Sequence, residues 1–236
     1  MTEELWYLKQ CDLFRRLTPE QLARLEPRCR SRVFKRGEPI YLPNDSAESA
    51  LVLAEGRVKI GSLTEEGKQT ILAFIEPGEL FGELAVLDGG PREEFAEAAE
   101  KSTVVLAPAE VMRELVEENP EVAIGVTKLI GLRRRRIERR LKSLLFRSNR
   151  QRLVSLLLEL AEQYGEPTEE LGPGSLRLRI KLSHQDMASV IGSTRETVTV
   201  VLGELQAEGL VGIGRRKIVM ADPRLLAEAA DGPKKG

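Results

Sequence analysis

Three polar residues with complementary hydrogen-bonding groups stand close together in the sequence, at Arg195, Glu196 and Thr199. An arginine can form two parallel hydrogen bonds with guanine, a glutamate can accept one from the amino group of cytosine, and a threonine methyl group can contact thymine. On the outer face of a helix, these side chains would therefore suit the base edges of duplex DNA. A helical hairpin inside an all-helical core is the structural alternative.

The elements that must position these residues are two short helices joined by a tight turn. The first helix is predicted to begin at Ser183, a good capping residue, and to end near Ile191. Gly192 then forms the turn, because glycine adopts a left-handed conformation at little cost. The second helix is predicted to begin at Ser193 or Thr194. Its apolar residues recur three and four positions apart as one buried stripe, which consists of Val198, Val201, Leu202 and Leu205.

A β-hairpin is predicted directly after the second helix, over residues 211–220 (VGIGRRKIVM). Gly214 and three basic residues form its tip, namely Arg215, Arg216 and Lys217. A basic hairpin after a helix-turn-helix makes a winged helix, whose wing would lie near a phosphate backbone. The motif, the wing and the charge together predict DNA binding.

The stretch GSTRETVTVVLGELQAEGLV, and residues 193–198 in particular, resembles the recognition helix and wing of the cyclic-AMP receptor/fumarate–nitrate regulator (CRP/FNR) family. The resemblance covers nearly the whole chain. It implies a homodimeric transcription regulator that binds an inverted-repeat operator in double-stranded DNA and works with RNA polymerase. It also implies that Arg195 and Glu196 read bases. We further expect Thr199 to contact a thymine methyl group or a phosphate. Val200 stands where the cyclic-AMP receptor has a second base-reading arginine, so the half-site is expected to differ.

The same resemblance implies contacts with the DNA backbone. The candidates are polar and basic residues of the two helices and the wing: Ser183, His184, Ser193, Thr194, Arg215, Arg216 and Lys217. His184 is the single histidine of the chain, so it cannot form a multi-histidine metal site. Two interpretations of it stay open, an idle surface residue and a phosphate contact.

Short β segments separated by turn residues occupy the N-terminal half of the chain. The predicted strands are residues 33–41, 50–54, 57–62, 70–75 and 95–106. Short strands at this spacing are typical of a small sandwich or barrel. The family resemblance implies that this N-terminal half is a jelly-roll-like cyclic-nucleotide-binding domain. The predicted fold class is α+β: this domain, a long dimerisation helix and a C-terminal winged helix-turn-helix.

The loop of residues 78–92, GELFGELAVLDGGPR, resembles the family's phosphate-binding cassette. Gly82 lets the backbone approach a ligand closely, and a short helix that begins with Glu83 and Leu84 could offer amides to an anion. Arg92 could bind a phosphate through two parallel hydrogen bonds. In cyclic-AMP receptors, the resemblance implies, the equivalent of Glu83 bonds the ribose hydroxyl and that of Arg92 pairs with the cyclic phosphate.

Two departures from the family pattern bear on the effector. Family members that bind cyclic AMP follow the cassette arginine with serine or threonine, whereas Glu93 and Glu94 follow Arg92 here. A carboxylate at this place would repel a phosphate and could pair with Arg92 instead. Ile137 and Glu138 stand where the receptor has threonine and serine for adenine. We therefore expect a regulator that is active without a nucleotide, with a cyclic-nucleotide-dependent regulator as the alternative.

A long helix is predicted from Pro120 to about Phe146. Ile130, Ile137 and Leu144 are spaced by sevens along it, as in a coiled-coil seam, and this indicates a parallel homodimer. A hinge is predicted near Asn149. The predicted domains are an effector-sensing domain (residues 1–118), the dimerisation helix (119–147) and a DNA-binding domain (148–236).

Composition and charge fit this assignment. The 236 residues are 42% hydrophobic and 31% charged, which suits a globular protein of one large or two modest domains. The net charge of −1 hides an asymmetry, because residues 1–110 carry 14 basic and 20 acidic side chains and the remainder 22 and 17. A basic C-terminal half suits a polyanionic partner.

Several other classes of protein are disfavoured by the sequence. No nucleophile motif or acid–base pair for an enzyme is visible, and two cysteines are too few for a four-thiolate zinc or iron–sulfur site. No apolar run approaches the ~20 residues that span a bilayer, and no signal-peptide core opens the chain. A cytoplasmic protein without a metal or a membrane partner is expected.

Overall fold

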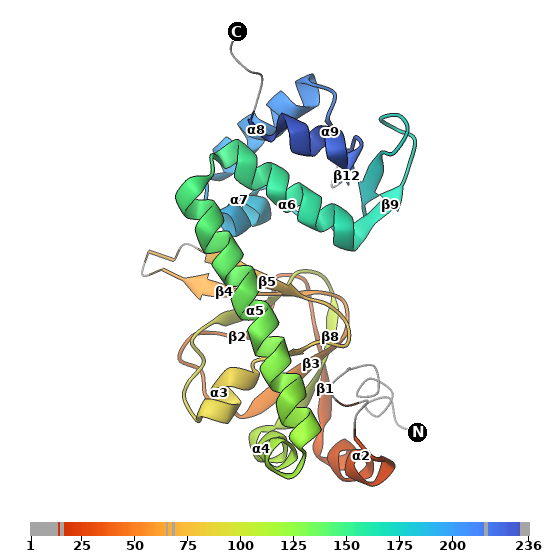
Figure 1. Cartoon of the computed structure of the whole chain (residues 1–236). Helices are drawn as coiled ribbons and strands as arrows, with labels where there is room; N and C mark the ends of the chain where they lie inside the picture. Colours follow the sequence, from red (N-terminus) through yellow and green to blue (C-terminus); the bar gives the residue numbers. More distant parts are fainter. Residues whose placement is uncertain (1–13, 15–16, 65, 68, 215–216, 232–236) are drawn as a thin grey trace. The chain divides into compact units, whose positions relative to one another are not determined.

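The computed structural model describes residues 14, 17–64, 66–67, 69–214 and 217–231. The chain divides into two compact units, residues 1–135 and 136–236, and helix α5 (Pro120–Phe146) crosses the boundary (Figure 1). The first unit contains a β-sandwich and the second a helix-turn-helix with a small sheet, so the predicted α+β fold class is confirmed. The predicted domain limits, 1–118, 119–147 and 148–236, stay a prediction.

The sandwich consists of antiparallel sheets. In the described part of the first unit, one sheet has the strand order β1-β8-β3-β6 and the other β2-β7-β4-β5. The strands are β1 (Arg30–Phe34), β2 (Pro39–Tyr41), β3 (Ser49–Glu55), β4 (Val58–Leu63), β5 (Gln69–Ile75), β6 (Leu80–Phe81), β7 (Phe95–Ala98) and β8 (Ser102–Pro108). Both sheets contribute to the core between them, in which Phe34, Leu53, Ile75 and Phe81 are almost fully buried.

Two of the predicted strands are each divided between the sheets. Residues 33–41 supply the end of β1 to one sheet and β2 to the other, with Gly37 at φ +80° between them. Residues 95–106 likewise contain β7 and most of β8. A sandwich requires strands that change sheets at a corner. The corner in residues 33–41 is the polar run of residues 35–38 (KRGE), which the predicted strand crossed without a break.

Helices cover the second face of β3 and β8. These are α2 (Pro19–Leu25), α4 (Ala109–Glu118) and the first turns of α5, and the 3-10 turn η2 (Glu26–Arg28) follows α2 without a buried residue. Val52 and Val105 join the apolar cluster that these helices form, together with Val122 and Val126 of α5. Because one face of β3 packs against the other sheet and the second against helices, residues 50–54 are all buried.

The apolar residues of α5 therefore serve two purposes. Those of its first turns belong to the core of the first unit, whereas Ile137, Leu141 and Leu144 are 43%, 55% and 43% exposed. The sequence predicted a single apolar side along the whole helix. Only the C-terminal part of that side is available to a partner.

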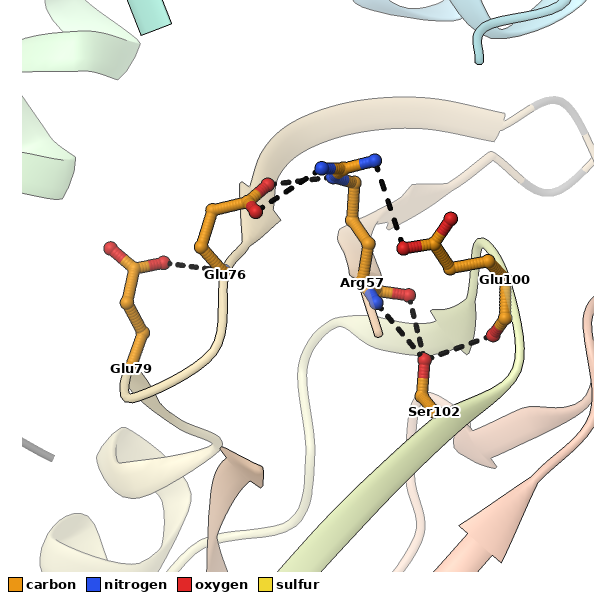
Figure 2. Close-up of polar contacts among 5 residues, drawn as sticks. All are labelled: Arg57, Glu76, Glu79, Glu100 and Ser102. Atoms are coloured by element: carbon orange, nitrogen blue, oxygen red, sulfur yellow. Dashed lines mark hydrogen bonds and ion pairs between the residues drawn. The ribbon is translucent and has the colours of Figure 1, made fainter. Parts of the chain in front are cut away.

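A polar cluster around Arg57 fixes the corner before β4 (Figure 2). The Arg57 Nε atom donates to Glu76 Oε1 at 2.6 Å, and Arg57 Nη1 lies 3.9 Å from Glu100 Oε1. The Ser102 hydroxyl accepts from the Arg57 amide at 3.1 Å and contacts the Glu100 carbonyl at 2.9 Å. The cluster thus ties together three segments that are distant in the sequence.

The second unit packs its helices on a sheet with the strand order β11-β12-β10-β9. Its elements after α5 are α6 (Asn149–Tyr164), β9 (Gly165–Pro167), β10 (Leu176–Leu178), α7 (His184–Ile191), α8 (Arg195–Ala207), β11 (Val211–Gly214), β12 (Lys217–Met220), α9 (Pro223–Glu228) and the 3-10 turn η3 (Ala229–Asp231). A capping box of Ser148 and Gln151 starts α6. Helix α9 was not predicted, although Asp222 followed by Pro223 is a recognisable helix start.

Candidate nucleic-acid interface

Local hydrogen bonds define both helices of the helix-turn-helix. The Ser183 hydroxyl accepts from the Asp186 amide at 3.1 Å, and the Asp186 carboxylate accepts from the Ser183 amide at 2.9 Å, so a capping box starts α7. Gly192 ends α7 at φ +62°. The Thr194 hydroxyl accepts from the Thr197 amide at 3.1 Å and caps α8. Ser183 and Thr194 therefore have capping roles, whether or not they also contact DNA.

The second helix, α8, has one buried and one exposed face. Val198, Val201, Leu202 and Leu205 are at most 7% exposed and confirm the predicted stripe. Arg195, Glu196 and Thr199 are all exposed. Within the described part of the chain, no hydrogen bond or ion pair involves the side chains of Arg195 or Glu196. Their donors and acceptors are thus available to another molecule.

Two of the predicted contact residues meet each other. His184 Nδ1, in the first turn of α7, lies 2.8 Å from Thr199 Oγ1 on α8. The sequence analysis named both residues without predicting this contact. The distance depends on how the two helices cross, which a sequence does not reveal.

Helix α6 holds both helices of the motif through two arginines that the sequence analysis did not assign to the site. Arg150 Nη2 pairs with Glu208 Oε2 at 2.5 Å, next to the C-terminal end of α8. Arg152 Nη1 donates to the carbonyls of Ile191 at 2.7 Å and Gly192 at 3.2 Å, where α7 ends. Positive groups at helix C-termini are stabilising, because they complement the helix dipole.

The described part of the wing is partly neutralised. Lys217 Nζ lies 2.6 Å from Glu170 Oε2, and Arg177 Nε donates to the other oxygen of Glu170 at 3.1 Å. Hydrogen bonds from Lys217 and Arg177 lower the pKa of Glu170 to about 2. Arg215 and Arg216, the other predicted wing contacts, fall outside the described residues.

The cassette loop forms the short helix that the sequence predicted. Helix α3 (Glu83–Asp88) begins directly after Gly82, whose φ is +65°. A Cβ atom on Gly82 would lie 2.7 Å from Arg92 Nη1, so the close approach requires glycine. Leu84 is 53% exposed.

Arg92 is directed into the protein. It is 4% exposed, and its Nη1 and Nη2 atoms donate to the backbone carbonyls of Gly82 and Ser49. Its guanidinium carbon lies 4.5 Å from the ring centre of Tyr41. Burial lowers the pKa of Arg92. Both terminal nitrogens of Arg92 are therefore bonded to the main chain.

Glu83 is buried and bonded on one side. Arg133 Nη1, from α5, lies 2.7 Å from Glu83 Oε1. Glu83 Oε2 and Arg92 Nε are buried and have no hydrogen-bond partner in the part of the chain that the structure describes. The free oxygen of Glu83 fits the ribose hydroxyl that the family resemblance implies.

The acidic residue close to Arg92 is Glu94 rather than Glu93. Glu93 is exposed, whereas the half-buried Glu94 accepts a hydrogen bond from the Tyr41 hydroxyl at 2.8 Å. Burial raises the pKa of Glu94, although Tyr41 and the nearby arginines oppose this shift. The residues thus fit the ribose of a cyclic nucleotide but not its phosphate.

Other kinds of site find no support in this structure. Among the described residues, no three or more His, Cys, Asp or Glu side chains are grouped so that they could hold a metal ion. The helices of the described segments are all too short or too polar to cross a membrane.

An exposed polar face on a helix-turn-helix, joined in one chain to a β-sandwich, is typical of a DNA-binding transcription regulator. Comparisons with known proteins agree. The model of the cyclic nucleotide-binding domain matches residues 31–119, and that of the Crp-like helix-turn-helix domain matches residues 151–229. The chain belongs to the CRP/FNR family of transcription regulators, whose members are typically homodimers and are not enzymes.

Individual relatives are similar over most of their length. The chain is 34% identical to the global nitrogen regulator of Synechococcus elongatus, over 83% of this chain and 87% of that protein. It is 31% identical to the cyclic AMP receptor protein of Thermus thermophilus, over 95% and 99%. The structure of FixK2 from Bradyrhizobium japonicum superposes with a TM-score of 0.73 at 25% identity, over 85% and 96%.

Proposed function

We propose that two copies of this chain bind an inverted-repeat operator and that they do so without a cyclic nucleotide. The observation that carries the proposal is the exposed N-terminal face of α8. Arg195 and Glu196 lie on it without partners in the described residues, directly after the cap at Thr194. In a helix-turn-helix, the N-terminal residues of the second helix contact base edges in the major groove. Arg195 and Glu196 are therefore assigned to base reading.

The remaining contacts are assigned to the DNA backbone. Ser183, Ser193 and Thr194 lie at the two helix starts, and the wing supplies Arg215, Arg216 and Lys217. Backbone contacts of this kind fix the orientation of the protein on the duplex and carry no sequence information. RNA polymerase is the further partner expected of such a regulator in the cytoplasm.

The exposed apolar residues of α5 support a homodimer. Ile137, Leu141 and Leu144 are between 43% and 55% exposed on one long helix, and they are spaced four and three residues apart. Apolar side chains at such spacing associate with a second helix. Two-fold symmetry would then place two copies of α8 in successive major grooves, about 34 Å apart.

The contacts of Arg92 support activity without a nucleotide. Both terminal nitrogens of Arg92 donate to carbonyls, and the carboxylate of Glu94 stands near its guanidinium. A cyclic phosphate would have to displace these hydrogen bonds and approach a carboxylate. Binding of the phosphate is therefore opposed.

A cyclic-nucleotide-dependent regulator is the second candidate. The buried Glu83 Oε2 atom, which has no partner in the described residues, favours it. A buried acceptor without a donor is unfavourable, and a ribose hydroxyl would supply one. The name of the Thermus thermophilus relative, cyclic AMP receptor protein, points the same way.

Selection of bound sequences from random duplex DNA tests the proposal. The selection is run without nucleotide, with cyclic AMP and with cyclic GMP. We expect the same inverted repeat to be enriched in all three, with equal affinity. Enrichment only with a nucleotide would establish the second candidate, and no enriched repeat under any condition would refute both.

A further inference from the structure

His184 and Thr199 form a contact between the two helices of the DNA-binding motif. The atoms His184 Nδ1 and Thr199 Oγ1 are 2.8 Å apart. Thr199 is exposed on the same side of α8 as Arg195, and His184 is half-buried beside it. The contact thus lies at the surface that is assigned to base reading.

The second partner of Thr199 decides which atom donates the hydrogen bond between His184 and Thr199. Thr199 Oγ1 also lies 2.9 Å from the backbone carbonyl of Arg195. A carbonyl can only accept, so the single hydroxyl hydrogen of Thr199 is donated to it. His184 Nδ1 then carries a hydrogen and donates it to Thr199 Oγ1. In this way both contacts are satisfied.

The two hydrogen bonds fix the orientation of the Thr199 side chain. A helical threonine otherwise divides between two rotamers, because its hydroxyl can bond the preceding turn in either. The bond from His184 selects the one in which Oγ1 faces α7. The hydroxyl is then engaged within the protein, and the methyl group is the part of the side chain left to contact DNA.

We propose that Thr199 is a specificity-determining residue that reads a thymine through its methyl group, and that His184 is the positioning residue that holds it. The C5-methyl group distinguishes thymine in the major groove, and an apolar side-chain group can recognise it by direct contact. This role replaces both earlier interpretations of His184, the idle residue and the phosphate contact. The inference rests on the proposed placement of α8 in the major groove.

Replacement of thymine by deoxyuracil tests the inference, because it removes only the C5-methyl group. Each thymine of one selected half-site is replaced in turn. The dissociation constant for the deoxyuracil operator is then divided by that for the thymine operator, and this ratio is the measured quantity. We expect one position at which the wild-type protein binds deoxyuracil about fourfold more weakly, from the loss of one buried methyl group. The other thymines should give ratios near one.

Matched variants of Thr199 separate the methyl group from the hydroxyl group. Thr199→Val removes the hydroxyl but keeps a methyl group in place, because valine in a helix has one strongly preferred rotamer and does not need His184, so the ratio at that position should persist. Thr199→Ser keeps the hydroxyl and removes the methyl group, so the ratio should fall to about one. A ratio that persists in Thr199→Ser, or the absence of any methyl-dependent position, would overturn the role of Thr199.

Matched variants of His184 test the positioning role. Asparagine can donate from nearly the position of Nδ1, whereas leucine of similar size cannot. His184→Leu should lower the ratio, and His184→Asn should restore it, with unchanged affinity for random DNA and unchanged melting temperature. A loss of affinity for random DNA at an unchanged ratio would identify a phosphate contact and overturn the positioning role. Failure to select any repeat would instead refute the proposed function itself.

Discussion

Among single residues, Arg195 has the most direct part in the proposed sequence recognition. Its side chain is exposed on the first turn of α8 and has no partner in the described residues. We expect Arg195→Ala to weaken binding to the selected operator by about 1–3 kcal/mol and to relax specificity at one base pair. Titrations of operator and of random DNA measure both effects. Equal losses on the two DNAs would show that Arg195 contacts phosphate and not a base.

Glu94 makes stability depend on pH. Burial raises its pKa above the ordinary value of 4.5. Between 4.5 and the raised pKa, the folded chain binds more protons than the unfolded chain, so stability falls as pH rises through this window. Glu94→Gln removes this dependence and can still accept from Tyr41. We expect its melting temperature, relative to wild type, to be higher at pH 8 than at pH 4.

Glu93→Gln is the matched control for this measurement, because Glu93 is exposed. It should leave the pH dependence of the melting temperature unchanged. If Glu94→Gln and Glu93→Gln behave alike, burial of Glu94 does not govern the stability of the cassette.

At the scale of elements, the ion pairs of Glu170 restrain the wing. Glu170 neutralises Lys217 and Arg177, which lie on β12 and β10. Glu170→Gln should free Lys217 for a phosphate and steepen the slope of log K against log salt by about one. The neighbouring Glu169→Gln, at another exposed residue, should have a smaller effect. Identical slopes for the wild type and Glu170→Gln would argue against a phosphate contact by Lys217.

Arg152 connects the start of α6 with the end of α7. It bonds the carbonyls of Ile191 and Gly192, and its Nη2 atom also donates to Asn149 Oδ1 at 2.7 Å. We expect Arg152→Ala to lower the free energy of unfolding of the second unit by about 2 kcal/mol, because charged hydrogen bonds are lost. Arg179→Ala, which removes an exposed ion pair of 3.3 Å, should change it by less than about 1 kcal/mol. Urea unfolding measures both, and equal effects would contradict the account.

The elements that local residues determine were predicted well. The caps at Ser183 and Thr194, the turn at Gly192 and the apolar stripe of α8 are all short-range features, and each is present. The division of residues 33–41 between two sheets was missed, although the polar residues 35–38 (KRGE) mark the corner, because a local pattern does not reveal which sheet each segment joins.

The contacts of the site residues were harder to predict from the sequence. The partner of Arg92 Nη2 is the carbonyl of Ser49, 43 residues away, and the partner of Glu83 is Arg133, 50 residues away. Such pairs depend on how distant strands and helices pack. The sequence therefore predicted the short helix of this loop but not the contacts of its side chains within the protein.

At the scale of the whole molecule, the exposed part of α5 is the proposed dimer interface. A charge placed in the middle of an apolar helix seam opposes association. We expect Ile137→Lys to shift the protein from dimer to monomer in analytical ultracentrifugation and to weaken operator binding. Val33→Lys, at a residue of β1 that is 54% exposed, is the control and should stay dimeric. A dimeric Ile137→Lys protein would place the interface elsewhere.

Two copies of α8 held by one dimer must match the helical repeat of DNA. The most direct test of this arrangement is the affinity of the nucleotide-free protein for operators whose half-sites are moved apart in steps of one base pair. We predict tight binding only where the half-site centres are about 10 base pairs apart. Affinity should fall steeply when the spacing is increased by half a turn of the DNA helix. Equal affinity at every spacing, or binding that appears only after cyclic AMP is added, would contradict the account.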